Sequence, residues 1–402
     1  MRRPILTVFY QFDPWSNSLG GIQTIIRSFI KYAPDTFELR LVGTQVEERI
    51  QPGQWQEREL AGRKIQFMPL FTQPQENRKS LIPDSVRYTA GLLRQCLASD
   101  FMHFHRLEPT LATRNWVGDK TLFIHNDIQQ QVQSSDRKGS ILWQYLPAAY
   151  FAIERQVVSQ FTEILSCNTA SATFYKQRYP ACADRVRYLR NTVDDDVFFP
   201  LSPGEREHAR QEFARSQKLD SKTRFVLFAG RLHPQKDPLL LVRAIAALDD
   251  PTTHLLIAGE GDLADAIRSE IAQLELDDRV TLLGALPQSE MAKLQRLVSV
   301  FVLSSAYEGL PVTVLEALAS GTPVVTTRCG ETPNLLDRQS GVVCDDRTAA
   351  GLAAAIQQVL ASPPDFPSQA CVDCAEPYRA RTVVKSICDG MMQRWNQQQP
   401  PA

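Results

Sequence analysis

Short apolar runs rich in β-branched and aromatic residues recur through the first half of the chain, and helix-compatible stretches separate several of them. The strand-like runs are residues 5–10, 37–42, 64–69, 101–105, 121–125, 163–167 and 186–189. The helix-compatible stretches are residues 22–32, 85–98, 143–160 and 170–179. A continuous apolar run is typical of a strand buried on both faces, so the alternation predicts a parallel sheet with helices on both sides.

A polar segment interrupts this pattern before it starts again. Residues 191–200 read NTVDDDVFFP, and a strongly polar stretch follows them up to residue 222. Strand-like runs resume at 224–229, 254–258, 279–283, 300–304, 324–327 and 341–343, with helices expected at 239–248, 288–297, 312–320 and 348–360. We therefore predict an α/β domain over residues 1–197, a second one over 198–376, and a closing helix at about 377–397 that packs back on the first.

Composition agrees with a globular chain of two domains. The 402 residues, 43% hydrophobic and 22% charged, exceed what one ordinary core accommodates. The net charge of −1 conceals an asymmetry: residues 1–190 hold 24 Lys and Arg against 17 Asp and Glu, and the remainder hold 20 against 28. A basic first half suits an acidic substrate or an anionic membrane surface, and opposite signs favour closure of the two halves, although the cations are scattered.

The sequence favours a cytoplasmic protein. No run of about 18 apolar residues occurs, so we expect no membrane span. The N-terminus imitates a signal peptide, but Asp13 and Pro14 cut its apolar run short, so it is better interpreted as the first strand. Eight scattered cysteines indicate reduced thiols rather than a disulfide scaffold. Cys371 and Cys374 form a lone CxxC pair, for which metal or redox use is the less favoured interpretation.

Two glutamates lie in and before the helix expected at residues 312–320. Pro311 suits the start of this helix and Gly321 its end. The helix is apolar almost all round, which is typical of a buried helix, yet Glu316 lies in its middle. A buried carboxylate needs hydrogen-bond donors from the protein or from a ligand. Glu308 lies in the preceding loop, where backbone N–H groups favour an anion; the alternative is a solvated loop acid and a core glutamate paired with a neighbour.

Polar residues also follow the strands of the first domain, where ligands of parallel sheets gather. They are Gly20 and Gly21, His105 and Arg106, and His125, Asn126 and Asp127. A double glycine at a helix entry lets a ligand approach backbone N–H groups, although it also suits a plain strand-to-helix turn. His125 is the better ligand candidate, whereas His105 is more readily a structural histidine.

The loop of residues 230–238 carries two cations, Arg231 and Lys236, between a strand and a helix. Such a pair suits a diphosphate, although loop cations are most often only solvated. Gly259 and Gly261 partly match the dinucleotide-binding fingerprint. A nicotinamide-dependent dehydrogenase is therefore an alternative, but the fingerprint is incomplete and no acid clearly ends the next strand.

The set of motifs resembles the retaining glycosyltransferases of family 4, also described as glycosyl transferases group 1. Its most specific parts are the two glutamates with seven residues between them, in YEGLPVTVLEALASGTPVV, and the GRLHPQKD connection. The early double glycine and the NTVDDDVFFP segment add support, and the similarity covers nearly the whole chain. The resemblance implies the GT-B architecture, in which two Rossmann-like domains with parallel sheets face each other across a central cleft.

The resemblance also implies a role for each candidate residue. Glu316 would accept hydrogen bonds from the ribose hydroxyls of a nucleotide sugar, and Glu308 would hold the donor sugar. Arg231 and Lys236 would neutralise the departing diphosphate. The implied catalytic residues are Arg231, Lys236, Glu308 and His125; the implied donor-binding residues are Gly20, Gly21, Gly230, Glu308, Gly309, Leu310, Val312 and Glu316; and Gly259, Gly284 and Leu286 would lie near the nucleotide base.

The family transfers sugars with retention of configuration and has no established protein nucleophile. The usual proposal is a front-face route in which the leaving phosphate takes the acceptor proton, so the two glutamates do not imply glycosidase chemistry. Because protein cations do the neutralising, we expect no metal and no cofactor. The run Asp194 to Asp196 matches the Asp-x-Asp metal-binding motif in sequence only, and its position in the linker argues against a metal site.

This chain departs from the family at two places. Thr192 stands where glycine is usual, and the loop of residues 328–334 lacks the second glycine and the glutamate after proline. A nucleotide-sugar 2-epimerase of the same architecture is an alternative that needs no separate acceptor. A non-catalytic nucleotide-sugar-binding protein is another, but it predicts loss of Arg231, Lys236 or Glu308, and all three are present.

We expect the partners to be a nucleotide sugar, with UDP favoured over GDP, and a glycan, lipid-linked or small-molecule acceptor. The acceptor would bind loops of the first domain that include Trp15, residues 69–83 and residues 103–109. No nucleic acid is expected, and peripheral contact with the cytoplasmic face of a membrane is a further expectation.

Overall fold

The computed structural model describes residues 2–16, 20–46, 50–73, 82–125, 147–248 and 250–398. The chain forms two compact units, one up to Asn191 together with the segment from Ala380, and the other Thr192–Arg379. Residues 192–197 therefore group with the second unit, where Val193 donates its N–H to the Tyr378 carbonyl (2.9 Å) and Phe198 enters the core.

The described part of the first unit contains an eight-stranded sheet in the order β3-β4-β2-β1-β5-β6-β7-β8. The strands are β1 Ile5–Phe9, β2 Glu38–Gln45, β3 Gln56–Leu60, β4 Arg63–Thr72, β5 Phe101–Phe104, β6 Asp119–Ile124, β7 Glu163–Ser166 and β8 Val186–Tyr188. All pairings are parallel except β3 with β4. The polar edge strand β3 carries no apolar signal, which is why the sequence did not predict it.

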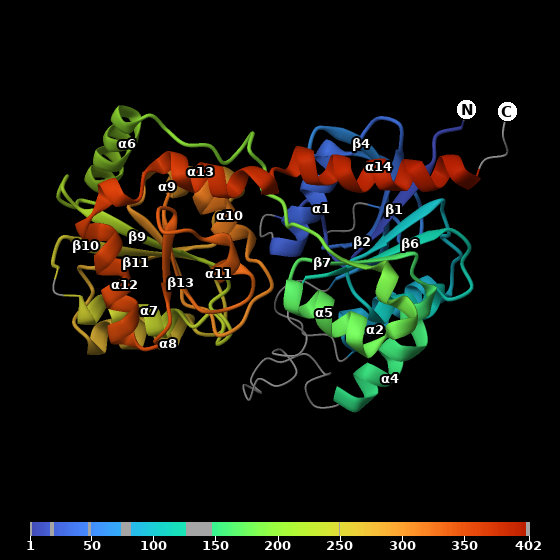
Figure 1. Ribbon diagram of the computed structural model, residues 1–402, viewed down its shortest axis with the longest axis horizontal. Helices are drawn as coiled ribbons and strands as arrows, with labels where there is room; N and C mark the ends of the chain where they lie inside the picture. Colours follow the sequence, from blue (N-terminus) through green and yellow to red (C-terminus); the bar gives the residue numbers. More distant parts are fainter. Residues whose placement is uncertain are drawn as a thin grey trace. The chain divides into compact units, whose positions relative to one another are not determined.

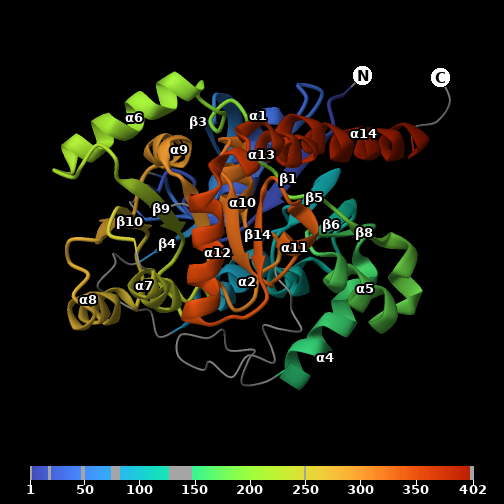
Figure 2. The same ribbon diagram turned by 60° about the vertical axis from the view of Figure 1, so that its left-hand side comes forward.

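Helices cover both faces of this sheet (Figures 1 and 2). They are α1 Gly21–Tyr32, α2 Asp84–Leu93, α4 Pro147–Val157, α5 Thr169–Arg178 and α14 Ala380–Gln398, with 3₁₀ turns η1 Glu108–Thr113, η3 Val158–Gln160 and η4 Pro180–Arg185. Apolar residues of α1 and α14 share one core, and those of α2 and α5 share the other. Met391 and Val384 of α14 are fully buried in the same core as residues of β1 and α1, so the last helix is part of the first unit.

The described part of the second unit contains a six-stranded parallel sheet in the order β11-β10-β9-β12-β13-β14. The strands are β9 Arg224–Ala229, β10 Thr253–Ala258, β11 Val280–Gly284, β12 Val300–Leu303, β13 Val324–Thr327 and β14 Gly341–Cys344. The helices are α6 Pro203–Ser216, α7 Pro238–Ala247, α8 Ala264–Gln273, α9 Gln288–Leu297, α10 Val312–Ala319, α11 Thr332–Leu335, α12 Ala349–Ala361 and α13 Ser368–Ala375, with 3₁₀ turns η5 Pro363–Asp365 and η6 Glu376–Tyr378. Residues of α9, α10 and α13 pack on one face, and those of α7, α8 and α12 on the other.

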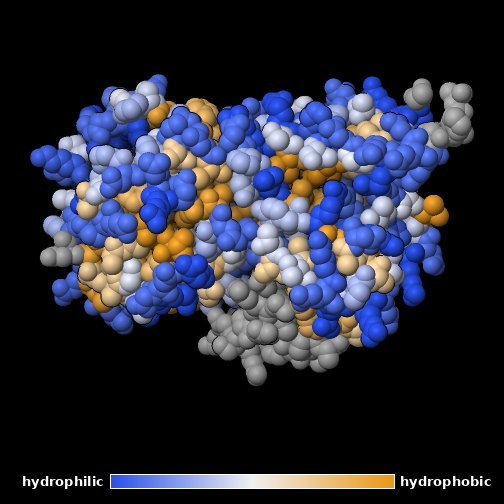
Figure 3. Space-filling view, in the orientation of Figure 1, coloured by the Kyte–Doolittle hydropathy of each residue, from blue (hydrophilic) through white to orange (hydrophobic). Residues whose placement is uncertain are grey.

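The predicted fold class is confirmed, because each unit is a sheet with helices on both faces, wholly parallel in the second unit and parallel except for β3 in the first. The polar stretch after residue 200 is nevertheless helical rather than a plain linker. Helix α6 begins with a capping box, in which Ser202 and Glu205 satisfy each other's backbone N–H groups, and it buries little beyond Ala214. Hydrophilic side chains cover most of the face in Figure 3. Among the described helices, none combines the length and apolar character that a membrane crossing requires.

Candidate functional site

Two loops at the carboxyl edge of the second sheet meet through a buried ion pair. Lys236 lies between β9 and α7, and Glu308 lies between β12 and α10; β9 and β12 are neighbours in the sheet. Lys236 Nζ donates to Glu308 Oε1 at 2.5 Å, with side chains 16% and 6% exposed. Ser305 Oγ donates to the same oxygen at 2.7 Å. The pair places one cation and one anion side by side in a largely water-free position, where their electrostatic effect is strong.

Backbone contacts fix the relative position of these two loops. Ser304 Oγ donates to the Lys236 carbonyl (2.9 Å), and Ala306 N–H donates to the Gln235 carbonyl (2.8 Å). The amide of Gln235 reaches the carbonyl of Tyr307 (3.1 Å). Sequence reasoning missed these supporting residues; the signal that could have indicated them was the polar Ser304-Ser305 pair directly after the apolar run of β12.

A third loop, after β13, closes against the Glu308 loop. Glu331 N–H donates to the Gly309 carbonyl at 2.8 Å. Gly330 has φ +58°, and a Cβ there would lie 2.3 Å from the Gly309 carbonyl oxygen, so glycine is required. Asn334, which stands where glutamate is usual, donates to Glu331 Oε1 at 3.2 Å. Asn334 therefore contacts another residue of the loop in which this chain departs from the family pattern.

Glu316 is a buried acid in the middle of an apolar helix. Helix α10 begins after Pro311, and its other residues, apart from Thr313, are buried in the core. Glu316 is only 7% exposed, and among the described residues its carboxyl group makes no hydrogen bond or ion pair. Burial raises the pKa of its carboxyl group to about 8. A carboxyl group in such a position is prepared to accept hydrogen bonds from a ligand.

The glycines expected near a nucleotide base lie at the ends of adjacent strands. Gly259 N–H donates to the Gly284 carbonyl (2.8 Å), and a Cβ on Gly259 would lie 1.9 Å from the Gly230 carbonyl oxygen. Gly259 is thus explained by close packing of loops. Leu286 packs partly buried against the core of the same unit. Gly309, Leu310 and Val312 are buried beside Glu308 and at the start of α10.

Arg231 and Lys236 differ in their surroundings, although the sequence analysis grouped them as one clamp. Arg231 is exposed, and among the described residues its side chain has no hydrogen-bond or ion-pair partner. Lys236 is instead paired with Glu308. The structure therefore brings Lys236, Glu308 and Ser305 together and leaves Arg231 available on the same strand-to-helix connection.

In the first unit, the predicted residues lie at the carboxyl edge of the sheet. Gly20 is the N-cap of α1, and its N–H is held by the Gln23 side chain. His125 follows β6, and its Nε2 lies 2.8 Å from Nδ1 of His105, which follows β5. Asn126 and Asp127, together with residues 74–81 of the expected acceptor loops and residues 143–146 of an expected helix, lie outside the described residues.

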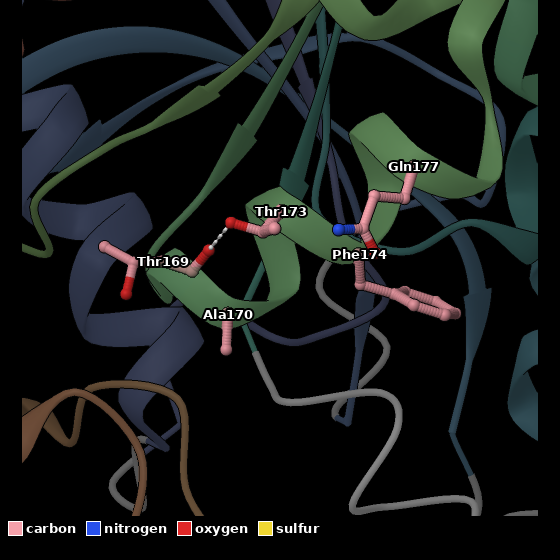
Figure 4. A pocket seen from close by; sticks show the side chains of 5 residues that line it. All are labelled: Thr169, Ala170, Thr173, Phe174 and Gln177. Carbon is pink, nitrogen blue, oxygen red and sulfur yellow. Dashed lines mark hydrogen bonds between the residues drawn. The ribbon is translucent and has the colours of Figure 1, made fainter.

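A surface pocket of about 350 Å³ lies along α5, which starts where β7 ends next to β6. Thr169, Thr173, Gln177 and Phe174 line it with Ala170 (Figure 4). Thr173 Oγ1 donates to the Thr169 carbonyl at 2.9 Å. The pocket thus presents hydroxyl and amide groups beside one aromatic ring.

Two other candidates from the sequence have structural explanations. Burial raises the pKa of the Cys371 thiol to about 12 and also raises the pKa of Cys374, so neither is an activated thiolate. Asp194 is buried and accepts the N–H of Asp196 (3.2 Å), which stabilises a turn. In the part of the chain that the structure describes, no group of three His, Cys, Asp or Glu side chains is arranged to hold a metal ion.

Comparison with known proteins finds a family match within the second unit. Residues 209–376 match the family model of glycosyl transferases group 1. This segment contains every candidate residue of the second unit, from Gly230 to Glu316. A D-inositol 3-phosphate glycosyltransferase of Segniliparus rotundus is 30% identical over 217 residues, which are 52% of this chain and 47% of that relative. The chain thus matches about half the length of this curated relative.

Solved glycosyltransferase structures share the fold of the whole chain. Sucrose-phosphate synthase from Thermosynechococcus elongatus has a TM-score of 0.78 at 18% identity and covers 98% of this chain and 99% of its own. HepE of Anabaena, solved in complex with UDP-glucose, has a TM-score of 0.70 at 16% identity, and the match covers 98% of this chain and 100% of HepE. These likenesses establish the GT-B type of fold.

Proposed function

We propose that this protein is a retaining glycosyltransferase that moves a sugar from a nucleotide-diphosphate sugar to a hydroxyl acceptor. The single observation that carries the proposal is Glu316, whose carboxyl group is buried in an apolar helix, has no partner within the described parts of the chain and has its pKa raised to about 8. Leaving a carboxylate in this environment is unfavourable unless a ligand supplies donors. The two neighbouring hydroxyl groups of a nucleotide's ribose supply two such hydrogen-bond donors.

The remaining groups of the second unit suit the diphosphate and the sugar. Arg231 is exposed and unpaired among the described residues, so it can bind a phosphate without first breaking a contact. Lys236 is held by Glu308 until charge develops on the departing phosphate, to which it can then donate. Glu308 keeps its bond from Ser305 and can accept from sugar hydroxyls. The N–H groups at the start of α10 favour the distal phosphate.

This arrangement supports a reaction without a protein nucleophile and without a metal. The lysine and arginine together supply the positive charge that a divalent ion supplies elsewhere. The bond between the reacting carbon and the phosphate oxygen would break as the acceptor hydroxyl attacks from the same face. The departing phosphate oxygen would take the acceptor proton. The configuration at the reacting carbon is then retained.

The acceptor would bind the first unit, near His125 and the pocket along α5. Both lie at the same edge of the first sheet, and the hydroxyl and amide groups of that pocket suit a sugar or polyol. The names of the relatives support this class of acceptor and UDP as the nucleotide, since one is named an inositol-phosphate glycosyltransferase and another was solved with UDP-glucose. A cytoplasmic location and contact with a membrane surface stay predictions.

Thermal unfolding with UDP, GDP or ADP tests nucleotide binding. We expect UDP to raise the midpoint, because a ligand that binds only the folded state stabilises it by mass action, and we expect Glu316→Ala to abolish the increase. No increase with any nucleotide would overturn the proposal.

Product analysis with UDP-glucose, with and without sugar or polyol acceptors, tests the reaction itself. We expect a product with the donor's anomeric configuration, at a rate that EDTA leaves unchanged. A Mn²⁺ requirement would contradict the metal-free mechanism. Formation of an epimerised donor without any acceptor would favour the 2-epimerase.

A further inference from the structure

Two histidines on neighbouring strands of the first sheet form a hydrogen-bonded pair. Strands β5 and β6 are parallel, with Phe104 opposite Leu122. His105 follows β5 directly, and His125 follows the last residue of β6. His105 Nδ1 and His125 Nε2 are 2.8 Å apart, and the planes of the two rings lie within 11° of each other.

The ring of His105 is held in place by other aromatic rings. It is parallel to Phe123, with 4.6 Å between ring centroids, and the ring of Tyr10 meets it edge-on at 6.2 Å. The residue is only 5% exposed. The stacked ring, the burial and the bond to His125 together favour this one orientation, in which Nδ1 is directed at His125.

The bond between the two rings restricts where their protons lie. Burial lowers the pKa of His105 well below its usual value and that of His125 to about 4, so both rings are neutral near pH 7. A neutral imidazole carries one N–H, and an N–H···N bond needs one donor and one acceptor. Both rings must therefore carry their protons on Nδ1, or both on Nε2.

The same bond leaves one nitrogen of His125 for another partner. Nε2 is occupied by His105, whereas Nδ1 is buried and has no hydrogen-bond partner among the described residues. A buried ring nitrogen without a partner is unfavourable unless a ligand completes its hydrogen bond.

We propose that His105 is a positioning residue for His125: it fixes the tautomer and the ring orientation of His125, so that Nδ1 of His125 meets the substrate in one hydrogen-bonding role. The inference rests on the proposed function, in which the acceptor binds near His125. His105 itself touches no substrate in this scheme and acts only through its neighbour.

Nitrogen-15 NMR of the histidine-labelled free protein reads the tautomers without any substrate. The chain has six histidines, and substituting them one at a time assigns their NMR signals. We expect the same protonated nitrogen, Nδ1 or Nε2, in His105 and His125, and we expect His105→Phe to change the His125 signals. Opposite tautomers in the wild type, or an unchanged His125 in His105→Phe, would overturn the proposal.

Kinetics of three variants separate positioning from packing. His105→Phe keeps the ring against Phe123 and removes both nitrogens, so we expect kcat to fall about tenfold or more with little change in KM for the donor. His105→Asn offers an amide near the position of Nδ1 and should restore much of the rate. His103→Phe is the control, because His103 contacts Phe123 at 4.9 Å between centroids but both its nitrogens are unpaired.

An equal loss of activity in His103→Phe and His105→Phe would reduce the effect to packing and overturn the proposal. Absence of transfer in the wild type with every donor would instead reject the proposed function. The NMR result for the free protein still decides the histidine pair in that case, so the two failures are distinguishable.

Discussion

At the scale of single residues, this protein keeps a carboxyl group where folding alone disfavours it. The raised pKa of Glu316 has a definite consequence for stability. The group ionises near pH 4.5 in the unfolded chain and near pH 8 in the folded one. Between these values the unfolded state loses a proton that the folded state keeps, so the free energy of unfolding falls as pH rises and levels off above about 8.

Replacing Glu316 by Gln should remove this pH dependence. We expect Glu316→Gln to match the wild type at pH 4.5 and to exceed it at pH 8 by on the order of 4 kcal/mol, since one pKa unit corresponds to ~1.4 kcal/mol. Denaturant unfolding followed by circular dichroism at several pH values measures the difference. Glu290→Gln, which alters an exposed acid paired with Lys293, is the matched control and should leave the curve unchanged.

The Lys236–Glu308 pair allows a double-mutant test of function against folding. Lys236→Met or Glu308→Gln alone leaves one charge buried without its partner, so each should lower the free energy of unfolding by about 3 kcal/mol. The double variant should recover part of this loss. Sugar transfer should fall at least ~100-fold in all three, because Lys236→Met removes the cation for the leaving phosphate and Glu308→Gln removes the carboxylate that holds this lysine and accepts from the sugar. A double variant that is both stable and active would refute the assigned roles.

At the scale of elements, three loops at the carboxyl edge of the second sheet depend on glycines that let backbones touch. Gly330→Ala combines a left-handed backbone with a Cβ 2.3 Å from the Gly309 carbonyl oxygen. Gly62→Ala in the β3–β4 turn has the strain alone, with φ +75° and nothing within 4 Å of the added Cβ. Gly62→Ala therefore measures the cost of the backbone strain alone, about 1 kcal/mol of the free energy of unfolding.

We therefore expect Gly330→Ala to weaken nucleotide binding as well as stability, whereas Gly62→Ala should lower stability only. The added methyl group must displace the loop that carries Glu308. Midpoint shifts with and without UDP measure both effects. Equal UDP-induced shifts in the two variants would show that the loop contact does not shape the site.

At the scale of the whole molecule, the last helix completes the first unit. Arg394 of α14 donates to Asp119 of β6 at 2.5 Å, and Asp119 is only 4% exposed. The sequence holds no tryptophan between residues 192 and 379, and Trp15, Trp55, Trp116 and Trp395 lie in the described part of the first unit. Tryptophan fluorescence therefore reports the unfolding of the first unit alone.

Arg394→Met should lower the fluorescence-detected stability by about 2–3 kcal/mol, because it leaves a buried carboxylate without its cation. Lys385→Met on the same helix removes only an exposed pair with Asp389, whose side chains are 69% and 61% exposed, and should change little. A fluorescence transition in Arg394→Met at the wild-type position would show that this contact does not hold α14 in place.

The sequence by itself determined the fold class, because continuous apolar runs alternating with helices have few packings other than a parallel sheet covered on both faces. It also singled out Glu316, since a charge inside an apolar helix is visible in the pattern. Polar segments gave no such signal: β3 is an edge strand, and α6 owes its start to a capping box.

Only the tertiary structure decided which side chains meet. Lys236 and Glu308 are 72 residues apart, and Arg394 and Asp119 are 275 apart, so no local pattern could pair them. The histidine pair likewise depends on β5 and β6 being neighbours in register. The physical reason is that local sequence sets periodicity and burial, whereas strand order and loop packing set the contacts on which hydrogen bonds and charge pairs depend.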